Sequence, residues 1–213
     1  MDLLAYTLEP LHQDGDVILS SGVHARPGAG DLACVLVVAP AEEYASPATV
    51  ARLEHEYGLA PELDRRWAVR PAALARHQGR TVIVLEDAGG EPLDRQLAPM
   101  EIEAFLRLAI GLARAVAGAH AAGLVHKDIK PGHILVDPAT GGVRLTGFGI
   151  ASRLRRERQP PEPPGAMAGT LAYMAPEQTG RMNRSVDSRS DLYALGVTPR
   201  VLTGVAEVVR CSE

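Results

Sequence analysis

The first half of the chain is patterned as short strands. Apolar, β-branched runs occupy residues 17–19, 34–39 and 81–85, and turn-forming residues separate them. The run His77-Gln78-Gly79-Arg80 has the composition of a hairpin turn, so a further strand is expected near residues 67–74, before it. This pattern predicts a β-rich first half with one helical interruption.

The interruption is a predicted helix that begins at Ser46-Pro47. Serine is a favourable N-cap, and proline at the first helical position loses no hydrogen bond. Pro61 ends the pattern, and Glu56 lies on its apolar stripe. A carboxylate there either lies at the edge of a buried face or has an internal role. The apolar positions of the stripe are Val50, Leu53, Tyr57 and Ala60.

The second half of the chain is mainly helical in pattern. Residues 101–122 carry apolar side chains at helical spacing. Two short strands are expected at residues 134–136 and 143–145, on either side of a turn. A last helix is expected over residues 191–202, interrupted by Pro199. The apolar positions of the first helix are Ile102, Phe105, Leu106, Ala109, Leu112, Ala113 and Val116.

The composition is that of an ordinary globular domain. Apolar residues make up 46% of the chain, which is enough for a sizeable core, and charged residues make up 23%. Aromatic residues make up only 4%, so the core must rest on aliphatic side chains. The net charge of −4 argues against nucleic acid as a partner, because binding to phosphates needs a basic face.

The two cysteines, Cys34 and Cys211, have no metal-ligand spacing and suit a reducing compartment. Residues 1–7 lack the pattern of a signal peptide. No apolar run approaches the ~20 residues that a membrane span needs. A cytoplasmic protein without a membrane span is therefore expected.

The run His126-Lys127-Asp128-Ile129-Lys130-Pro131 carries the most specific chemistry in the chain. It resembles the catalytic loop of serine/threonine protein kinases, H-[RK]-D-x-K-P-x-N. In that family the Asp orients the substrate hydroxyl, the Lys reaches the transferred phosphate, and the Asn binds the second Mg²⁺. The resemblance implies that Asp128 and Lys130 are catalytic, and it places His133 at the Asn position.

The run Thr146-Gly147-Phe148-Gly149 is similar to the Asp-Phe-Gly motif of the same family. Phe148 and Gly149 are retained, but Gly147 replaces the Asp that holds Mg²⁺ in kinases. Binding of Mg²⁺ is therefore doubtful. Phe148 and His126 are expected to be core residues that link the lobes, whether or not the chain is active.

Two later motifs follow in the family's order. Residues 169–177 resemble the end of the activation segment, where Thr170 is expected to contact Asp128. The resemblance pairs Glu177 with an Arg from a later helix, and the chain ends at Glu213 without those helices, so Glu177 is expected to lack that partner. Asp191 opens the central C-lobe helix and is expected to bond the catalytic-loop backbone.

The resemblance also aligns the first lobe. If Glu56 is the glutamate of the αC helix, its spacing places Val37 where kinases have a phosphate-positioning lysine. The chain has no lysine before Lys127, so the Lys–Glu ion pair of the family is not expected. Glu56 is then expected to be hydrated or paired with an arginine.

Four positions align with the nucleotide-binding parts of kinases. Gly15 and Val17 lie in the Gly-rich loop, where one of the family's three glycines remains. The backbones of Glu86 and Ala88 align with the hinge that contacts adenine. The resemblance implies ATP as a possible ligand.

The charged residues also have simpler interpretations. Asp128 and Lys130 could be a solvated pair in a turn, but the neighbouring motifs argue against this. His133 is interpreted as a hydrogen-bonded loop residue in preference to a metal ligand. The basic run 153–158 is interpreted as a solvated activation loop in preference to a patch that docks a partner.

The resemblance predicts an α+β, two-lobed protein-kinase-like fold that is incomplete at the C-terminus. Residues 1–88 form its β-rich N-lobe and residues 89–213 a partial, mainly helical C-lobe. The stretch 177–185 is similar to the kinase-like N-terminal domain of large bacterial multidomain sensor histidine kinases. Partners are expected to be a protein substrate, a protein partner or other modules of such a sensor system.

The motifs leave three hypotheses of function. The first is a pseudokinase, a kinase-like signalling domain with weak or no ATP phosphotransfer. The second is a divergent serine/threonine kinase in which Asp128 acts as the base and Lys130 binds the γ-phosphate. The third is a truncated gene product without function, which the unfamiliar tail 205–213 favours. The residues at positions 37 and 147 favour the first over the second.

Overall fold

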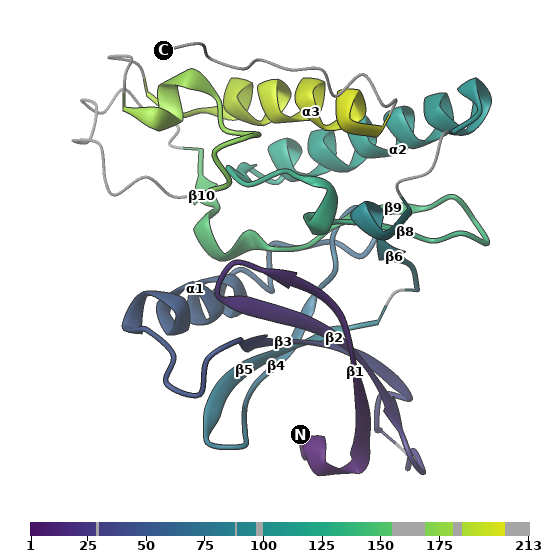
Figure 1. Ribbon diagram of the computed structural model, residues 1–213, viewed down its shortest axis with the longest axis vertical. Helices are drawn as coiled ribbons and strands as arrows, with labels where there is room; N and C mark the ends of the chain where they lie inside the picture. The colour runs from purple at the N-terminus through teal and green to yellow at the C-terminus, as the bar shows by residue number, and fades with distance from the viewer. Residues whose placement is uncertain (29, 88, 97–99, 155–168, 181–184, 203–213) are drawn as a thin grey trace.

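The computed structural model describes residues 1–28, 30–87, 89–96, 100–154, 169–180 and 185–202. A β-rich lobe lies beneath a mainly helical lobe, and α1 and the β1–β2 hairpin lie near the boundary between them (Figure 1). The predicted two-lobed α+β fold is therefore confirmed for the described residues.

Five antiparallel strands form the N-lobe sheet, in the order β1-β2-β3-β5-β4. Gln78 and Gly79 both have positive φ, at 49° and 77°, as a tight two-residue hairpin requires. The strand expected near residues 67–74 begins later, at Pro71, because Trp67 and Val69 hydrogen-bond Leu145 in the other lobe. The strands are β1 Tyr6–Asp14, β2 Val17–His24, β3 Cys34–Pro40, β4 Pro71–His77 and β5 Arg80–Glu86.

Helix α1 (Pro47–Gly58) begins as predicted. The Ser46 hydroxyl accepts a hydrogen bond from the Thr49 N–H at 3.1 Å, and Pro47 occupies the first turn. The predicted apolar stripe is wrong at Tyr57, which is 41% exposed. In this turn of the helix the buried residue is Glu56, one position before Tyr57. Its buried residues are Thr49, Leu53 and Glu56.

Alternate side chains of β3 point to opposite faces of the sheet. Val37 packs in the outer apolar cluster with Val82 and Val84. Val38 instead packs against the inner cluster that contains Leu53 of α1, and it lines the cleft between the lobes. Val38 therefore holds the strand-lysine position, and its assignment to Val37 is wrong by one residue.

Helix α2 (Ile102–Ala121) forms as predicted, and Leu112 and Val116 of the predicted stripe are buried, but the rest of the buried face differs. Ile102 and Leu106, two positions of the predicted stripe, are 69% and 50% exposed. The reason is a close approach at Gly118, where a β-carbon would lie 2.4 Å from the Trp67 ring. This contact fixes the rotation of the helix. Its buried residues are Leu108, Leu112, Ala115, Val116 and Ala119.

Short strands and 3₁₀ turns complete the C-lobe. The two strands predicted at residues 134–136 and 143–145 are confirmed with the same bounds. The strands are β6 Glu91–Pro92, β7 Leu124–Val125, β8 Ile134–Val136, β9 Val143–Leu145 and β10 Ser152–Arg153. The 3₁₀ turns are η1 Leu3–Ala5 in the N-lobe, and η2 Leu93–Gln96, η3 Pro131–His133, η4 Phe148–Ile150 and η5 Pro176–Thr179.

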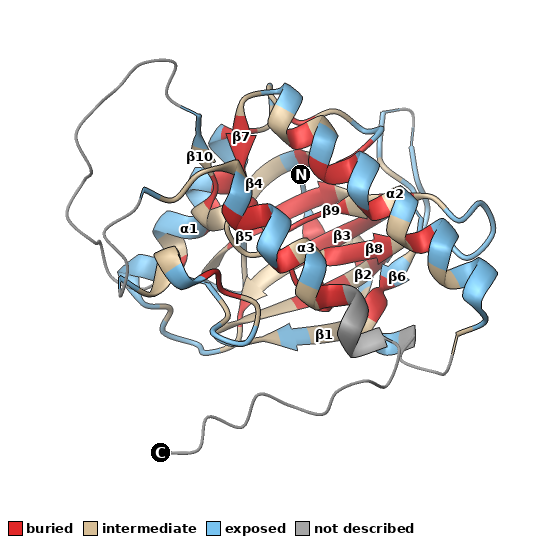
Figure 2. Ribbon diagram, turned by 90° about the horizontal axis from the view of Figure 1, so that it is seen from above, coloured by how far each residue is buried: buried red, intermediate tan, exposed pale blue. Residues whose placement is uncertain are grey.

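Helix α3 (Ser188–Leu202) lies beside α2, and both helices turn buried residues toward the strands beneath them (Figure 2). The helix continues past Pro199, so the predicted interruption is wrong. The Thr198 hydroxyl donates to the Ala194 carbonyl at 2.9 Å in the turn before the proline. None of the helices in the described part of the chain combines the length and hydropathy that crossing a bilayer requires.

Candidate functional site

Asp191 holds the backbone of the loop that contains Asp128. Its carboxylate is buried and accepts hydrogen bonds from the N–H groups of His126 and Lys127, each at 2.8 Å. Lys127 has φ +70°, a conformation that residues other than glycine rarely adopt. The Gln178 side chain donates to the Lys127 carbonyl at 2.8 Å. The turn that presents Asp128 is thus fixed from both sides.

His126 is fully buried and neutral. One ring nitrogen, Nε2, faces the Thr146 carbonyl at 2.9 Å and must donate to it, while Nδ1 accepts from the Asp128 N–H at 3.2 Å. Burial lowers the pKa of His126, which agrees with a ring that needs only one proton. The ring centroid lies 4.5 Å from that of Phe148, which is also fully buried.

Asp128 and Lys130 lie together with Thr170. The Lys130 ammonium is 3.1 Å from the Asp128 carboxylate and donates to the Thr170 hydroxyl at 2.6 Å. The Thr170 N–H donates to Asp128 Oδ1 at 2.8 Å. Burial raises the pKa of Asp128, but the charges of His133 and Lys130 outweigh it and hold the pKa below its ordinary value. Asp128 is therefore a carboxylate.

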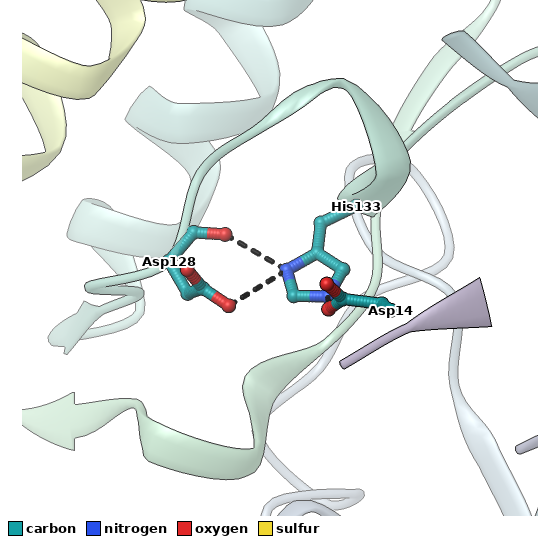
Figure 3. Close-up of side chains that lie close together, drawn as sticks. All are labelled: Asp14, Asp128 and His133. Atoms are coloured by element: carbon teal, nitrogen blue, oxygen red, sulfur yellow. Dashed lines mark hydrogen bonds and ion pairs between the residues drawn. The ribbon is translucent and has the colours of Figure 1, made fainter. Parts of the chain in front are cut away.

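His133 lies between two carboxylates (Figure 3). Its Nδ1 is 2.8 Å from the Asp128 carbonyl and 3.3 Å from the Asp128 carboxylate. Its Nε2 is 3.0 Å from the carboxylate of Asp14. Burial lowers the pKa of His133, but the hydrogen bond to Asp14 and the charge of Asp128 outweigh it and raise the pKa. Both nitrogens face acceptors, so the ring is an imidazolium with two donors.

Gly147 is shaped to fit His133. It has φ +80°, and a β-carbon there would lie 2.7 Å from three atoms of the His133 ring. An aspartate at this position, as the Asp-Phe-Gly motif has, would collide with the imidazole. The replacements at positions 133 and 147 are therefore coupled in space.

The residues at these two positions do not fit Mg²⁺. This ion takes oxygen ligands in nearly octahedral geometry. Gly147 offers no side-chain ligand, and both nitrogens of His133 are engaged by oxygens of Asp14 and Asp128. The Lys130 ammonium contacts both carboxylates, at 2.6 and 3.1 Å, so a cationic side chain already neutralises them.

Glu56 is 4% exposed and accepts a hydrogen bond from the Gly147 N–H at 3.2 Å. Within the part of the chain that the structure describes, no arginine forms an ion pair with Glu56, so the expected arginine pairing is not found there. Burial raises its pKa, and the positive charge of His133 and the Gly147 amide only partly oppose this. Arg52, which lines the same cavity as Glu56, forms its ion pair with Asp16 instead.

Gly15 and Val17 lie at the tip of the β1–β2 hairpin, where Gly15 has φ +56° and Val17 lines the interlobe cleft. Asp14 and Asp16 flank the glycine and anchor the tip on two sides. Asp14 is 2.6 Å from the Lys130 ammonium. Burial raises the pKa of Asp14, but hydrogen bonds from His133 and Lys130 outweigh this effect, and its pKa falls well below the ordinary value.

At the hinge, Glu86 ends β5 and pairs with Arg65 through two contacts, at 2.6 and 2.7 Å. Ala88 lies outside the described residues. Beside the hinge, an apolar cluster joins the lobes. Three of its leucines, Leu36, Leu85 and Leu135, are only 1%, 0% and 2% exposed.

The interlobe cavity lies at the other end of the cleft, by His133 and Glu56, and its volume is about 90 Å³. Pockets that hold drug-sized ligands measure ~300–1,000 Å³. This cavity by itself is smaller than such pockets.

Gly149 and Glu177 have structural partners. A β-carbon on Gly149 would lie 3.1 Å from Cβ of Arg52, so glycine permits the close approach of α1. The Ser190 hydroxyl donates to the Glu177 carboxylate at 2.8 Å. The activation-segment glutamate thus has a hydroxyl partner, although no arginine was expected to reach it. Of the basic run, Arg153 pairs with Glu62, and residues 155–158 lie outside the described part.

Comparison with known proteins agrees with this geometry. A profile of the protein kinase domain matches residues 38–208. The chain belongs to the protein kinase family.

Curated relatives are bacterial kinases. The chain is 40% identical over 167 residues to the serine/threonine-protein kinase PknA of Mycobacterium tuberculosis, an alignment that covers 68% of this chain and 38% of PknA. It is 39% identical over 162 residues to the DNA damage-responsive serine/threonine-protein kinase RqkA of Deinococcus radiodurans, covering 73% of this chain and 22% of that protein. The chain thus spans well under half the length of these relatives.

The structure adds four site residues that the sequence pattern does not single out, namely Asp14, Asp16, Arg52 and Gln178. A signal was present for the first two, since they flank Gly15, the one glycine that the sequence assigns to the Gly-rich loop. A carboxylate there repels phosphate and is free to attract cations of the protein itself.

Proposed function

We propose that the chain is a pseudokinase, a kinase-like signalling domain with weak or no ATP binding and no phosphotransfer. The observation that carries this proposal is the packing of the His133 ring against Gly147. Together these residues replace both side chains with which the family holds Mg²⁺. An enzyme that transfers a phosphoryl group depends on that ion to neutralise the developing charge.

Three further observations support the proposal. Val38 stands at the strand-lysine position, so no ammonium can pair with Glu56. The interlobe cavity of about 90 Å³ is smaller than the pockets that hold ligands of nucleotide size. Loss of one well-placed electrostatic group typically lowers kcat ~10²–10³-fold, and three are altered here. The losses need not multiply, but ordinary turnover is not expected.

Radiolabelled phosphate transfer tests the proposal. Wild type and Asp128→Asn are incubated with Mg²⁺-ATP and a general protein substrate, with an active bacterial kinase as a positive control. The proposal predicts equal background labelling for wild type and variant. Labelling by wild type that disappears in Asp128→Asn would overturn it.

One observation favours the second candidate, a divergent serine/threonine kinase. Asp128, Lys130 and Thr170 retain a connected arrangement, with Lys130 between the carboxylate and the hydroxyl. The relatives with about 40% identity are also named as serine/threonine kinases. The phosphate-transfer assay discriminates between the two candidates, since only the second predicts labelling that depends on Asp128.

The resemblance of residues 177–185 to sensor histidine kinases supports a narrower proposal. The domain would act in the cytoplasm by binding a protein, either a substrate-like partner or neighbouring modules of a sensor system. Co-purification of the chain with a separately expressed ATPase or histidine kinase module would support this placement. If neither module binds the chain, the narrower proposal is rejected, and the proposal of a pseudokinase is unaffected.

A further inference from the structure

Four charged side chains join the tip of the β1–β2 hairpin to the catalytic loop. The Asp14 carboxylate lies 2.6 Å from the Lys130 ammonium and 3.0 Å from His133 Nε2. The Asp128 carboxylate lies 3.1 Å from Lys130 and 3.3 Å from His133 Nδ1. With His133 as an imidazolium, two negative and two positive charges balance within this network.

This arrangement differs from a metal site, although Asp14, Asp128 and His133 lie close enough together to suggest one. The two carboxylates face opposite nitrogens of the His133 ring (Figure 3). An ion bound to one nitrogen would have to displace the carboxylate that already contacts it. Lys130 also contacts both carboxylates directly. The network is complete without a divalent cation.

The other side of the hairpin tip is held by α1. Asp16 accepts hydrogen bonds from the Thr49 hydroxyl and the Arg52 guanidinium. The tip between Asp14 and Asp16 therefore bridges α1 and the catalytic loop. It lies across the cleft at the point where Val17 and His133 line the same small cavity.

We propose that the β1–β2 hairpin is a latch, in which Asp14 binds Lys130 and His133 and closes the interlobe cleft without a divalent cation. The latch rests on the proposed function, since both describe a cleft closed to Mg²⁺-ATP. The latch adds the contacts that close the interlobe cleft and the condition under which the cleft opens. The cleft opens when Asp14 leaves the two cations.

Several charged groups face His133 and determine how firmly the latch holds. Asp14 faces it from β1 and Glu56 from α1, and the catalytic loop contributes Asp128, Lys130 and His126. Three are acids whose charges favour the imidazolium. Loss of the His133 proton leaves Lys130 as the sole cation of the network, so high pH weakens the latch.

Hydrogen–deuterium exchange of the peptide spanning residues 11–19 tests the latch. Asp14→Asn should accelerate exchange of this peptide about tenfold or more, because a charge-assisted network loses one partner. Glu9→Gln, an exposed acid on the same strand, is the matched control and should exchange like wild type. Neither EDTA nor Mg²⁺ should change the wild-type rate.

Exchange at β4 and β5 shows whether Asp14→Asn still folds. If that variant unfolds, wild type is compared at pH 6 and pH 9 after correction for intrinsic rates, and the peptide should lose protection at pH 9. Equal exchange in Asp14→Asn and wild type would overturn the latch, as would a wild-type peptide protected only with Mg²⁺-ATP. Labelling that depends on Asp128 would instead contradict the proposed function, so the two failures are distinguishable.

Discussion

The imidazole of His133 occupies the space that a side chain at Gly147 would need. A β-carbon on Gly147 would lie 2.7 Å from three ring atoms, and the backbone there has φ +80°. The two replacements that remove the family's metal ligands therefore support one another. Reversing one of them alone should damage the fold rather than restore the site.

The first prediction concerns this pair. Gly147→Asp should lower the free energy of unfolding by about 2–4 kcal/mol, because strain at positive φ adds to a collision with the ring. Combining it with His133→Asn should recover about 1–3 kcal/mol, because the ring is removed. Urea unfolding of the three proteins measures both effects.

Gly141→Asp is the matched control for this prediction. Gly141 has φ +68°, but no atom lies within 4 Å of a β-carbon added there, so it shares the strain without the collision. Its cost should be about 1 kcal/mol. If Gly147→Asp costs no more than Gly141→Asp, the coupling between positions 133 and 147 is refuted.

The second prediction concerns the buried carboxylate of Glu56. Burial raises its pKa above 4.5, so the folded state binds its proton more tightly than the unfolded state. The stability linked to that proton is complete below pH 4.5 and is lost as pH rises through the folded pKa. Glu56→Gln should therefore gain stability relative to wild type as pH rises above 4.5.

Urea midpoints across that range measure the gain. Glu54→Gln, an exposed position on the same helix, should stay within about 0.5 kcal/mol of wild type. Parallel pH profiles for wild type and Glu56→Gln would show that Glu56 is not the buried, proton-binding group that the structure indicates.

The third prediction concerns His133. Its pKa is raised above 6.5, so its stabilising charge is complete below that pH and is lost as pH rises through the folded pKa. His126 has a lowered pKa and acts in the opposite window, where stability falls as pH drops below 6.5. Stability lost as pH rises above 6.5 therefore reports His133.

The NMR titration of the His133 ring should show a midpoint above 6.5, and His133→Asn should flatten the stability profile at alkaline pH. A midpoint below 6.5 for this ring would contradict the imidazolium, and with it the charge balance of the network.

The fourth prediction concerns the rotation of α2. Gly118→Ala should destabilise the protein by about 1–3 kcal/mol, because the new methyl group meets Trp67. Gly196→Ala in α3 is the control, since nothing lies within 4 Å of its added β-carbon. It should gain about 0.5–1 kcal/mol from helix propensity. Thermal unfolding compares them, and stabilisation of both variants would reject the close packing at Trp67.

Much of the fold could be predicted from the sequence where the local signal was strong. The Ser46-Pro47 start of α1 and the bounds of β8 and β9 follow from capping and turn chemistry. The rotation of α2 about its axis could not be predicted, because apolar residues occur around most of its surface. The Trp67 contact, made by a distant segment, decides which face is buried.

The motif residues of the candidate site could be predicted from the sequence, but the side-chain contacts between them and other segments could not. Asp128, Lys130 and Asp191 follow from the motif that surrounds them. Val38 could not be separated from Val37, since a shift of one residue reverses the face of a strand. The partners of Glu56 and Asp14 come from segments far away in sequence, and one of them is a backbone amide that no side-chain pattern reveals.

Calorimetric titration of Mg²⁺-ATP into the wild-type chain tests the central claim most directly. The account predicts no saturation at nucleotide concentrations below about 1 mM, and no difference between Mg²⁺ and EDTA. Saturable binding in the micromolar range that requires Mg²⁺ and disappears in Asp128→Asn would contradict it. Such a result would show that the cleft opens to metal-bound nucleotide despite His133 and Gly147.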